Sequence, residues 1–263
     1  MTQTHDHECT REMNEVVIIT SAILPAPKVF MLAISDPQAR LIQVFACLQQ
    51  WILEAKAKRI VICDGTVDAA LFSPFSELAK DHGVELEVLT FSSSQSLISR
   101  LGKGYGEGEI LGHVMLNSRL LRDANCFYKI TGRLYIRNFQ EICLGHSAIP
   151  VVFNRKPRPG VADTRFFKCS VDYFKRNLMD AFKKANDPKG VFLEHLYCSI
   201  LEADNMLVPF SIQPQIVGRS GTTGRVNGVG EYPQEVLTAA EAMAMTHQSF
   251  RFIPQSGIAE LPE

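Results

Sequence analysis

Short apolar runs rich in β-branched residues alternate with longer segments of helical periodicity through the first half of the chain. Residues 16–20, 59–63 and 85–91 each have the character of a buried strand. Between the first two, Asp36 and Pro37 begin a helix, because aspartate caps a helix well and proline suits its first turn. Alternation at this spacing predicts an α/β fold with a mainly parallel sheet flanked by helices.

The remaining elements follow from the same patterns, which become less regular after residue 140. The first half continues with a helix over 68–81, a glycine-rich loop over 102–108, a helix over 109–121 and a strand over 127–136. The second half holds a strand at 151–153, a proline-rich loop over 154–161, helices over 171–184, 190–201 and 233–245, and an irregular segment over 218–230. We expect a flexible N-terminus over 1–15, a single domain over 16–250 and a loose tail over 251–263.

The charge and cysteine content limit the partners and the compartment. The 263 residues carry a net charge of −1, so no global field attracts nucleic acid, and any phosphate must be bound by a local cluster.

The seven cysteines include no Cys-x-x-Cys pair, which favours free thiols in a reducing, cytoplasmic compartment. The longest apolar stretch is interrupted by Pro25 and Pro27. We therefore expect no transmembrane segment, which leaves peripheral membrane contact open.

Two motifs occupy positions suited to nucleotide binding. Asp64 ends the second predicted strand, at the sheet edge where α/β proteins bind ligands, and its carboxylate could accept hydrogen bonds from ribose or a base. The alternative is a plain Asp-Gly turn. The glycine-rich run precedes a helix, whose N-terminus favours anions, and Lys103 and Gly104 are the candidate phosphate contacts. The alternative is a surface loop, because the spacing matches neither a dinucleotide fingerprint nor a P-loop.

Two arginine-bearing segments are further candidates for binding phosphate. Arg133 follows Gly132 in a strand that otherwise has the pattern of a buried one, so it needs an anionic partner. That partner is either a substrate phosphate or a protein carboxylate. Arg219 lies among glycines and hydroxyl residues over 218–225, which would form either an anion-binding flap or a disordered loop.

The second half supplies the candidate acid–base groups. Glu194 follows an apolar run, where partial burial suits a general base, and His195 is the other obvious acid–base group there. The alternative for Glu194 is pairing with a helix dipole. Asp163 and Arg165 form a second polar pair upstream.

Together these segments resemble bacterial glycosyltransferases of the capsule and lipopolysaccharide type, which have a GT-A-like, Rossmann-like fold. The likeness spans about residues 16–225. It rests on residues 18–21 with 36–41, 61–66, 102–109 with 128–133, and 164–167 with 193–197.

The resemblance implies a nucleotide-sugar donor, a saccharide or lipid-linked acceptor and an inverting transfer. It divides the domain into a nucleotide-binding half over 16–140 and an acceptor-side half over 141–250. It implies that Thr20, Ser21 and Asp64 bind the nucleotide and that Glu194 is the base. Our working hypothesis adds Lys103, Gly104, Arg133 and Arg219 as residues that bind the diphosphate, and Asp163, Arg165 and His195 as residues on the acceptor side.

One departure concerns the metal. GT-A enzymes usually carry an Asp-x-Asp motif after the fourth strand, where this chain has Thr131-Gly132-Arg133. Arginine can neutralise a leaving diphosphate without a metal, so we expect a metal-independent transferase without cofactor, or one with metal ligands elsewhere.

Two alternative functions remain. A sugar nucleotidyltransferase is disfavoured because residues 21–28 contain no glycine, and a non-catalytic nucleotide- or glycan-binding protein of the same fold stays open.

Overall fold

The computed structural model describes residues 15–156, 158–226 and 228–246. The expected flexible N-terminus, apart from Glu15, and the expected tail over 251–263 lie outside the described residues.

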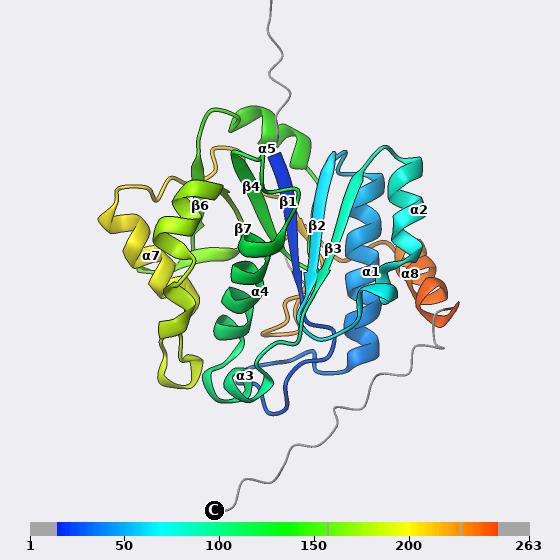
Figure 1. Cartoon of the computed structure of the whole chain (residues 1–263), viewed down its shortest axis with the longest axis horizontal. Coiled ribbons are helices and arrows are strands. Elements are labelled where there is room, and N and C mark those ends of the chain that lie inside the picture. Colours follow the sequence, from blue (N-terminus) through cyan, green and yellow to red (C-terminus); the bar gives the residue numbers. More distant parts are fainter. Residues whose placement is uncertain (1–14, 157, 227, 247–263) are drawn as a thin grey trace, which may run out of the picture.

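A six-stranded sheet with the order β3-β2-β1-β4-β7-β6 forms the centre of the molecule (Figure 1). β1 pairs in parallel with β2 and β4, and β2 with β3, whereas β7 runs antiparallel to β4 and β6. The prediction of an α/β fold with a mainly parallel sheet is confirmed. The strands are β1 (Glu15–Ser21), β2 (Arg59–Asp64), β3 (Glu85–Thr90), β4 (Cys126–Thr131), β6 (Val151–Arg155) and β7 (Ala162–Ser170), and a second sheet pairs β5 (Tyr135–Ile136) with β8 (Ile216–Val217).

Helices cover both faces of the sheet, because alternate residues of each central strand point to opposite sides. Val17 and Ile19 pack in one core with α1, whereas Val16 and Ile18 pack in a second core with α4 and α7. The helices are α1 (Pro37–Leu53), α2 (Pro74–Asp81), α3 (Gln95–Leu101), α4 (Lys103–Asn117), α5 (Phe139–Gly145), α6 (Val171–Tyr173), α7 (Leu193–Ala203) and α8 (Gln234–Thr246).

The first helix begins where the sequence predicts. The Asp36 side chain accepts a hydrogen bond from the backbone N–H of Ala39 at 2.7 Å, and Pro37 occupies the first helical turn. This cap fixes the point at which the loop after β1 ends.

The prediction of a glycine-rich loop over 102–108 is wrong, because α4 begins at Lys103 and Gly104, Gly106 and Gly108 are helical. Gly104, Gly106 and Gly108 are buried, and a Cβ atom on Gly108 would overlap the Phe182 side chain. The glycines therefore let other parts of the chain approach α4 closely, a reason that the local pattern does not contain.

Other boundaries also differ from the sequence prediction. The strand expected over 127–136 stops at Thr131 and turns, so β5 joins the second sheet instead. The helix expected over 171–184 is broken into α6, a π-helical turn at Phe174–Leu178 and a 3-10 turn at Ala181–Lys184. Two further 3-10 turns span Ala69–Phe72, ahead of α2, and Asp187–Lys189.

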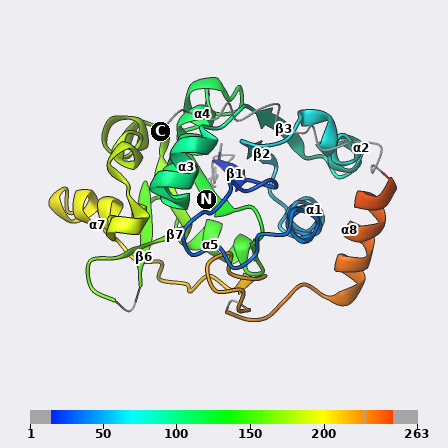
Figure 2. The same cartoon turned by 90° about the horizontal axis from the view of Figure 1, so that it is seen from below.

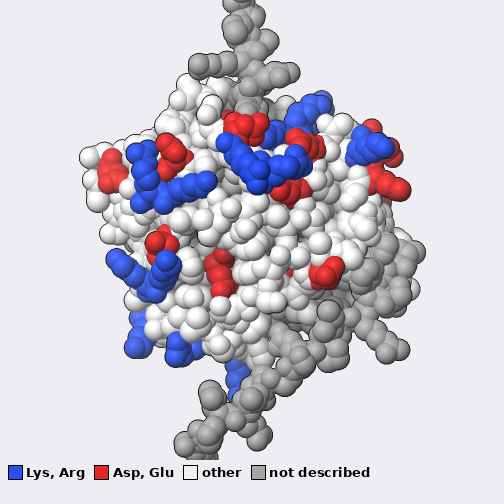
Figure 3. All heavy atoms as spheres, viewed as in Figure 1, with Lys and Arg blue, Asp and Glu red and all other residues white. Residues whose placement is uncertain are grey.

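The parallel strands β1 to β4 all end at one edge of the sheet, the lower edge in Figure 1. Figure 2 looks onto this edge, where the loop after β1 lies in front of the sheet beside α3. On the face that Figure 3 shows, basic and acidic side chains mostly lie beside one another. No helix in the described part of the chain is long and apolar enough to cross a membrane.

Candidate functional site

A cavity of about 600 Å³ opens at the carboxyl edge of the sheet. Its walls come from the loop after β1, the start of α4, the turn after β4 and the start of α7. Residues 219–223 form a further wall, and the backbone N–H of Ala33 donates to the Gly221 carbonyl at 2.9 Å across the cavity rim. Segments distant in sequence thus meet around one space.

The cavity carries an excess of positive charge. Among the described residues that line it, seven are basic and two are acidic. Such a lining favours an anionic ligand, because a low-dielectric cleft concentrates the field of its charges. The basic residues are Arg40, Lys103, Arg133, Lys156, Arg158, Arg165 and Arg219, and the acidic ones are Glu107 and Glu194.

Arg133 and Arg40 are the two buried cations among these residues. Arg133 is only 9% exposed, and its Nε atom has no hydrogen-bond partner among the described residues. Burial lowers the pKa of Arg133 below its ordinary value. Among the described residues no carboxylate forms a hydrogen bond or ion pair with its guanidinium, and the Glu107 carboxylate acts on it only through the electrostatic field. Its guanidinium is available for an anion.

Arg40 reaches the same region from α1. Its Nε donates to the Ala22 carbonyl at 2.7 Å and its Nη1 to the Ile34 carbonyl at 3.0 Å. Burial and the neighbouring Arg133 guanidinium lower the pKa of Arg40 well below its ordinary value. Two cations are therefore close together, an arrangement that a bound anion would stabilise.

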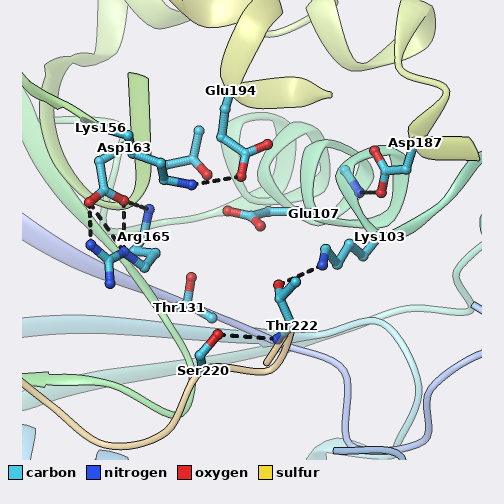
Figure 4. Close-up of polar contacts among 12 residues, drawn as sticks. Lys103, Glu107, Thr131, Lys156, Asp163, Arg165, Asp187, Glu194, Ser220 and Thr222 are labelled. Atoms are coloured by element: carbon cyan, nitrogen blue, oxygen red, sulfur yellow. Dashed lines mark hydrogen bonds and ion pairs between the residues drawn. The ribbon is translucent and has the colours of Figure 1, made fainter. Parts of the chain in front are cut away.

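Lys103 lies at the first position of α4 and points toward residues 219–223 (Figure 4). Its Nζ donates to Thr222 Oγ1 at 2.5 Å and to the Met31 carbonyl at 3.2 Å. Burial lowers the pKa of Lys103. Gly104, the next residue, does not line the cavity, and its N–H donates to Asp187 Oδ2 at 3.1 Å.

Asp64 is fully buried and does not line the cavity. Its carboxylate accepts hydrogen bonds from the backbone N–H of Ile23 at 3.0 Å and of Thr66 at 2.7 Å, and from Thr66 Oγ1 at 2.5 Å. It thus stabilises the loops after β1 and β2 from behind. Thr20 and Ser21 do line the cavity, and Ser21 Oγ has no hydrogen-bond partner in the part of the chain that the structure describes.

Glu107 is a cavity residue that the sequence reasoning missed. It forms an ion pair with Lys129 Nζ, which is fully buried and also donates to the Thr164 carbonyl at 2.7 Å and to Thr131 Oγ1 at 3.1 Å. Glu107 lies inside the glycine-rich run that was expected to be a loop. Helical spacing from Lys103 is the signal that would have placed Glu107 on the same face as Lys103.

Glu194 lies at the first turn of α7 on the opposite side of the cavity from residues 219–223. Its side chain is 25% exposed, and its Oε1 accepts a hydrogen bond from Lys156 Nζ at 3.1 Å (Figure 4). Among the described residues no hydrogen bond reaches Oε2. His195 also lines the cavity, and its Nδ1 lies 3.3 Å from the Gly190 carbonyl.

Asp163 and Arg165 form an ion pair, with the Arg165 Nη2 atom 2.6 Å from Asp163 Oδ2. Burial opposes the ionised form of Asp163, but its bonds with the Arg165 guanidinium lower the pKa of Asp163 below its ordinary value. Only Arg165 of this pair lines the cavity. Arg219 also lines it, although its side chain is about half exposed and forms an ion pair with Glu231.

The turn after β4 lacks the carboxylate ligands that a divalent cation prefers. The turn at Thr131, Gly132 and Arg133 offers no carboxylate. No group of three His, Cys, Asp or Glu side chains in the described ranges could hold a metal ion. Divalent cations such as Mg²⁺ bind through oxygen ligands that commonly include carboxylates, which this turn does not supply.

No family model and no curated protein matches the sequence. Among solved structures, the chain is similar in fold to the apo form of the glycosyltransferase GlyE of Streptococcus pneumoniae TIGR4, with a TM-score of 0.54 and 9% identity over 89% of this chain and 63% of that chain. Another GlyE structure gives a TM-score of 0.50 and 8% identity over 74% of this chain and 45% of that one. A cytidylyltransferase from Leptospira borgpetersenii serovar Hardjo-bovis (strain JB197) gives a TM-score of 0.39 and 13% identity over 84% and 76%.

The chain therefore spans less than two thirds of the length of these GlyE chains. At such identities the likeness establishes the fold, which is shared with the glycosyltransferase GlyE, and leaves the reaction to be argued from the site.

Proposed function

We propose that the chain is a glycosyltransferase that moves a sugar from a nucleotide-sugar donor to a saccharide or lipid-linked acceptor, with inversion and without a metal ion. In this proposal, residues 16–140 form the nucleotide-binding half and residues 141–250 the acceptor-side half. The observation that carries it is Arg133, a buried guanidinium without a hydrogen-bond partner for Nε, in a cavity lined mainly by cations. A buried, unpaired cation is unfavourable, so the site favours an anion such as a diphosphate.

The diphosphate would leave between three cations from different elements. Arg133 and Lys103 would donate hydrogen bonds to it, and Arg40 would add positive charge from α1. Charge-assisted bonds of this kind stabilise a leaving group whose negative charge grows in the transition state. No step requires a metal ion.

Glu194 would act as the base for the acceptor hydroxyl. As that oxygen forms a bond to the anomeric carbon, the bond from the anomeric carbon to the diphosphate oxygen breaks, and the hydroxyl proton passes to the carboxylate. Lys156 contacts Oε1 and fixes the orientation of the carboxylate, which leaves Oε2 to receive the proton. Arg165 and His195 would contact the acceptor.

A thermal-shift series with nucleoside diphosphates and nucleotide-sugars, with EDTA and with Mn²⁺, tests this proposal. A ligand at 100 times its Kd should stabilise the protein by about 2.7 kcal/mol. We expect one nucleotide class to give this shift in EDTA as well as in Mn²⁺, and the matching sugar donor to release its diphosphate when acceptor is added. Absence of any shift would overturn the proposal, and binding without turnover would favour a non-catalytic nucleotide-binding protein.

A further inference from the structure

Three of the side chains that line the cavity each contain a buried polar atom without a hydrogen-bond partner. These atoms are Arg133 Nε, Ser21 Oγ and Gln95 Oε1. Buried polar atoms are rarely left unpaired, so each is a candidate contact for a ligand. The proposed diphosphate accounts for Arg133. Of the other two residues, Ser21 is the last residue of β1 and Gln95 is the first residue of α3.

A chain of contacts holds these two residues at the same end of the cavity. Gln95 Nε2 donates to Ser93 Oγ at 2.5 Å, and the backbone N–H of Ser93 donates to the Gly65 carbonyl at 2.9 Å. The N–H of Gly65 in turn contacts the Ser21 carbonyl at 3.4 Å. The carboxamide of Gln95 is therefore fixed through one of its two ends, and the other end, Oε1, is left as an acceptor.

The other polar side chains of this end are already engaged. Thr66 Oγ1 donates to Asp64 Oδ1 at 2.5 Å and accepts from the backbone N–H of Leu24 at 3.0 Å. Asp64, the acceptor that the sequence suggested for the base or ribose, is turned away from the cavity. Gln95 Oε1 thus offers the acceptor that Asp64 does not.

We infer that Gln95 selects the base of the donor by accepting a hydrogen bond from a ring N–H that lies beside a carbonyl, as in uracil, thymine and guanine. The inference rests on the proposed function, because it assigns one end of the same cavity to the base. Cytosine and adenine present a ring nitrogen lone pair at the corresponding position, and two acceptors would then face each other without a proton between them. Ser21 Oγ can donate to a neighbouring carbonyl or hydroxyl of the same nucleoside.

Isothermal titration calorimetry with UDP, dTDP, GDP, CDP and ADP tests the inference on the full chain. We expect at least one of the first three to bind about tenfold tighter than both CDP and ADP, the loss that one unmade hydrogen bond commonly causes. The comparison of UDP and dTDP with GDP distinguishes a pyrimidine from a purine. Equal or tighter binding of CDP or ADP would overturn the inference.

Two further measurements assign the effect to Gln95. The Gln95→Met variant keeps the length of the side chain and loses the acceptor, so it should bind the preferred diphosphate about tenfold more weakly and bind CDP as the native protein does. Ser96→Ala, at an exposed neighbouring position, is the matched control and should change neither affinity. A nucleoside diphosphate methylated at the ring nitrogen should bind the native protein about tenfold more weakly than the unmethylated one. This measurement does not depend on whether the Gln95→Met variant is stable.

The outcomes separate this inference from the proposal on which it rests. If no nucleoside diphosphate binds, the proposed function fails and the inference with it. If diphosphates bind but ring methylation and Gln95→Met leave the affinities unchanged, only the role of Gln95 is overturned.

Discussion

The Oδ2 atom of Asp187 accepts a hydrogen bond from the backbone N–H of Gly104 at 3.1 Å, so a residue of the second half caps the helix that carries Lys103. A Cβ atom on Gly104 would lie 2.9 Å from Asp187 Oδ1, which explains why a glycine is needed at the contact. A helix N-terminus attracts anions, and here the protein supplies that anion itself. A bound phosphate must then be held by side chains.

Removing this cap should destabilise the fold. Asp187→Ala leaves the first amides of α4 unpaired and should lower the free energy of unfolding by about 1 kcal/mol, the usual cost of a lost cap. Asp187→Asn retains an acceptor and should cost less. Urea unfolding at pH 7 measures both. A variant Asp187→Ala as stable as the native protein would show that the contact contributes nothing.

The same carboxylate predicts a pH dependence of stability. Burial raises the pKa of Asp187 above its ordinary value of 3.8, so the folded protein holds this proton more tightly than the unfolded chain does. The contribution of Asp187 to stability is therefore greatest at low pH and is lost as the pH rises from about 3.8 through the folded-state pKa. As the pH rises through this range, the Tm of Asp187→Asn should therefore increase relative to the Tm of the native protein.

A matched control for the pH series is Asp172→Asn, because the Asp172 side chain is 88% exposed. Its Tm should follow that of the native protein at every pH. A Tm difference for Asp187→Asn that moves in the opposite direction would contradict the raised pKa.

Two glycines of α4 should respond in opposite ways to alanine. At Gly108 the new methyl group would overlap Phe182, and the required shifts should cost about 1–3 kcal/mol. At Gly112 the nearest heavy atom lies 3.9 Å away, so alanine fits and should stabilise the helix by about 0.5–1 kcal/mol. Thermal unfolding of the two variants makes the comparison, and equal effects would contradict the packing described for α4.

Arg133→Met should weaken binding of a nucleoside diphosphate and stabilise the unliganded protein. The first effect follows from the loss of charged hydrogen bonds, which are worth about 1.5–3 kcal/mol, and calorimetry measures it. The second follows because a buried cation, whose Nε has no hydrogen-bond partner among the described residues, is replaced by an apolar side chain of similar length. Arg137→Met, at an exposed position four residues on, is the control. Unchanged affinity in Arg133→Met would remove Arg133 from the phosphate site.

Glu194→Gln should abolish turnover while nucleotide binding survives. The amide keeps the shape of the side chain but cannot take the proton of the acceptor hydroxyl, so we expect a loss of about 10²–10⁴-fold in the rate of diphosphate release. Glu202→Gln, on the same helix and in an ion pair with Arg155, should leave the rate unchanged. Near-native turnover in Glu194→Gln would assign the base elsewhere.

Local sequence patterns decided the part of the fold that depends on neighbours in the chain. The alternation of strands and helices over the first half is local, because strand and helix periodicities arise from the geometry of consecutive residues. The start of α1 at Asp36 and Pro37 is local for the same reason, since the cap bonds to an amide three residues on. These patterns were sufficient to predict the mainly parallel sheet and the edge at which a ligand site would lie.

Tertiary structure alone decided which of the polar residues face the cavity. Asp64 was a candidate because it ends a strand, yet the distant backbone amide of Ile23, together with the nearby amide of Thr66, satisfies its carboxylate behind the loops. The glycine-rich run became a helix because Asp187 and Phe182, about 80 residues away in sequence, pack against it. Such contacts have no local signature, and they determine which atoms remain unpaired. Among the described residues, Arg133 Nε and Gln95 Oε1 are left without a hydrogen-bond partner because the fold pairs the neighbouring polar groups with one another.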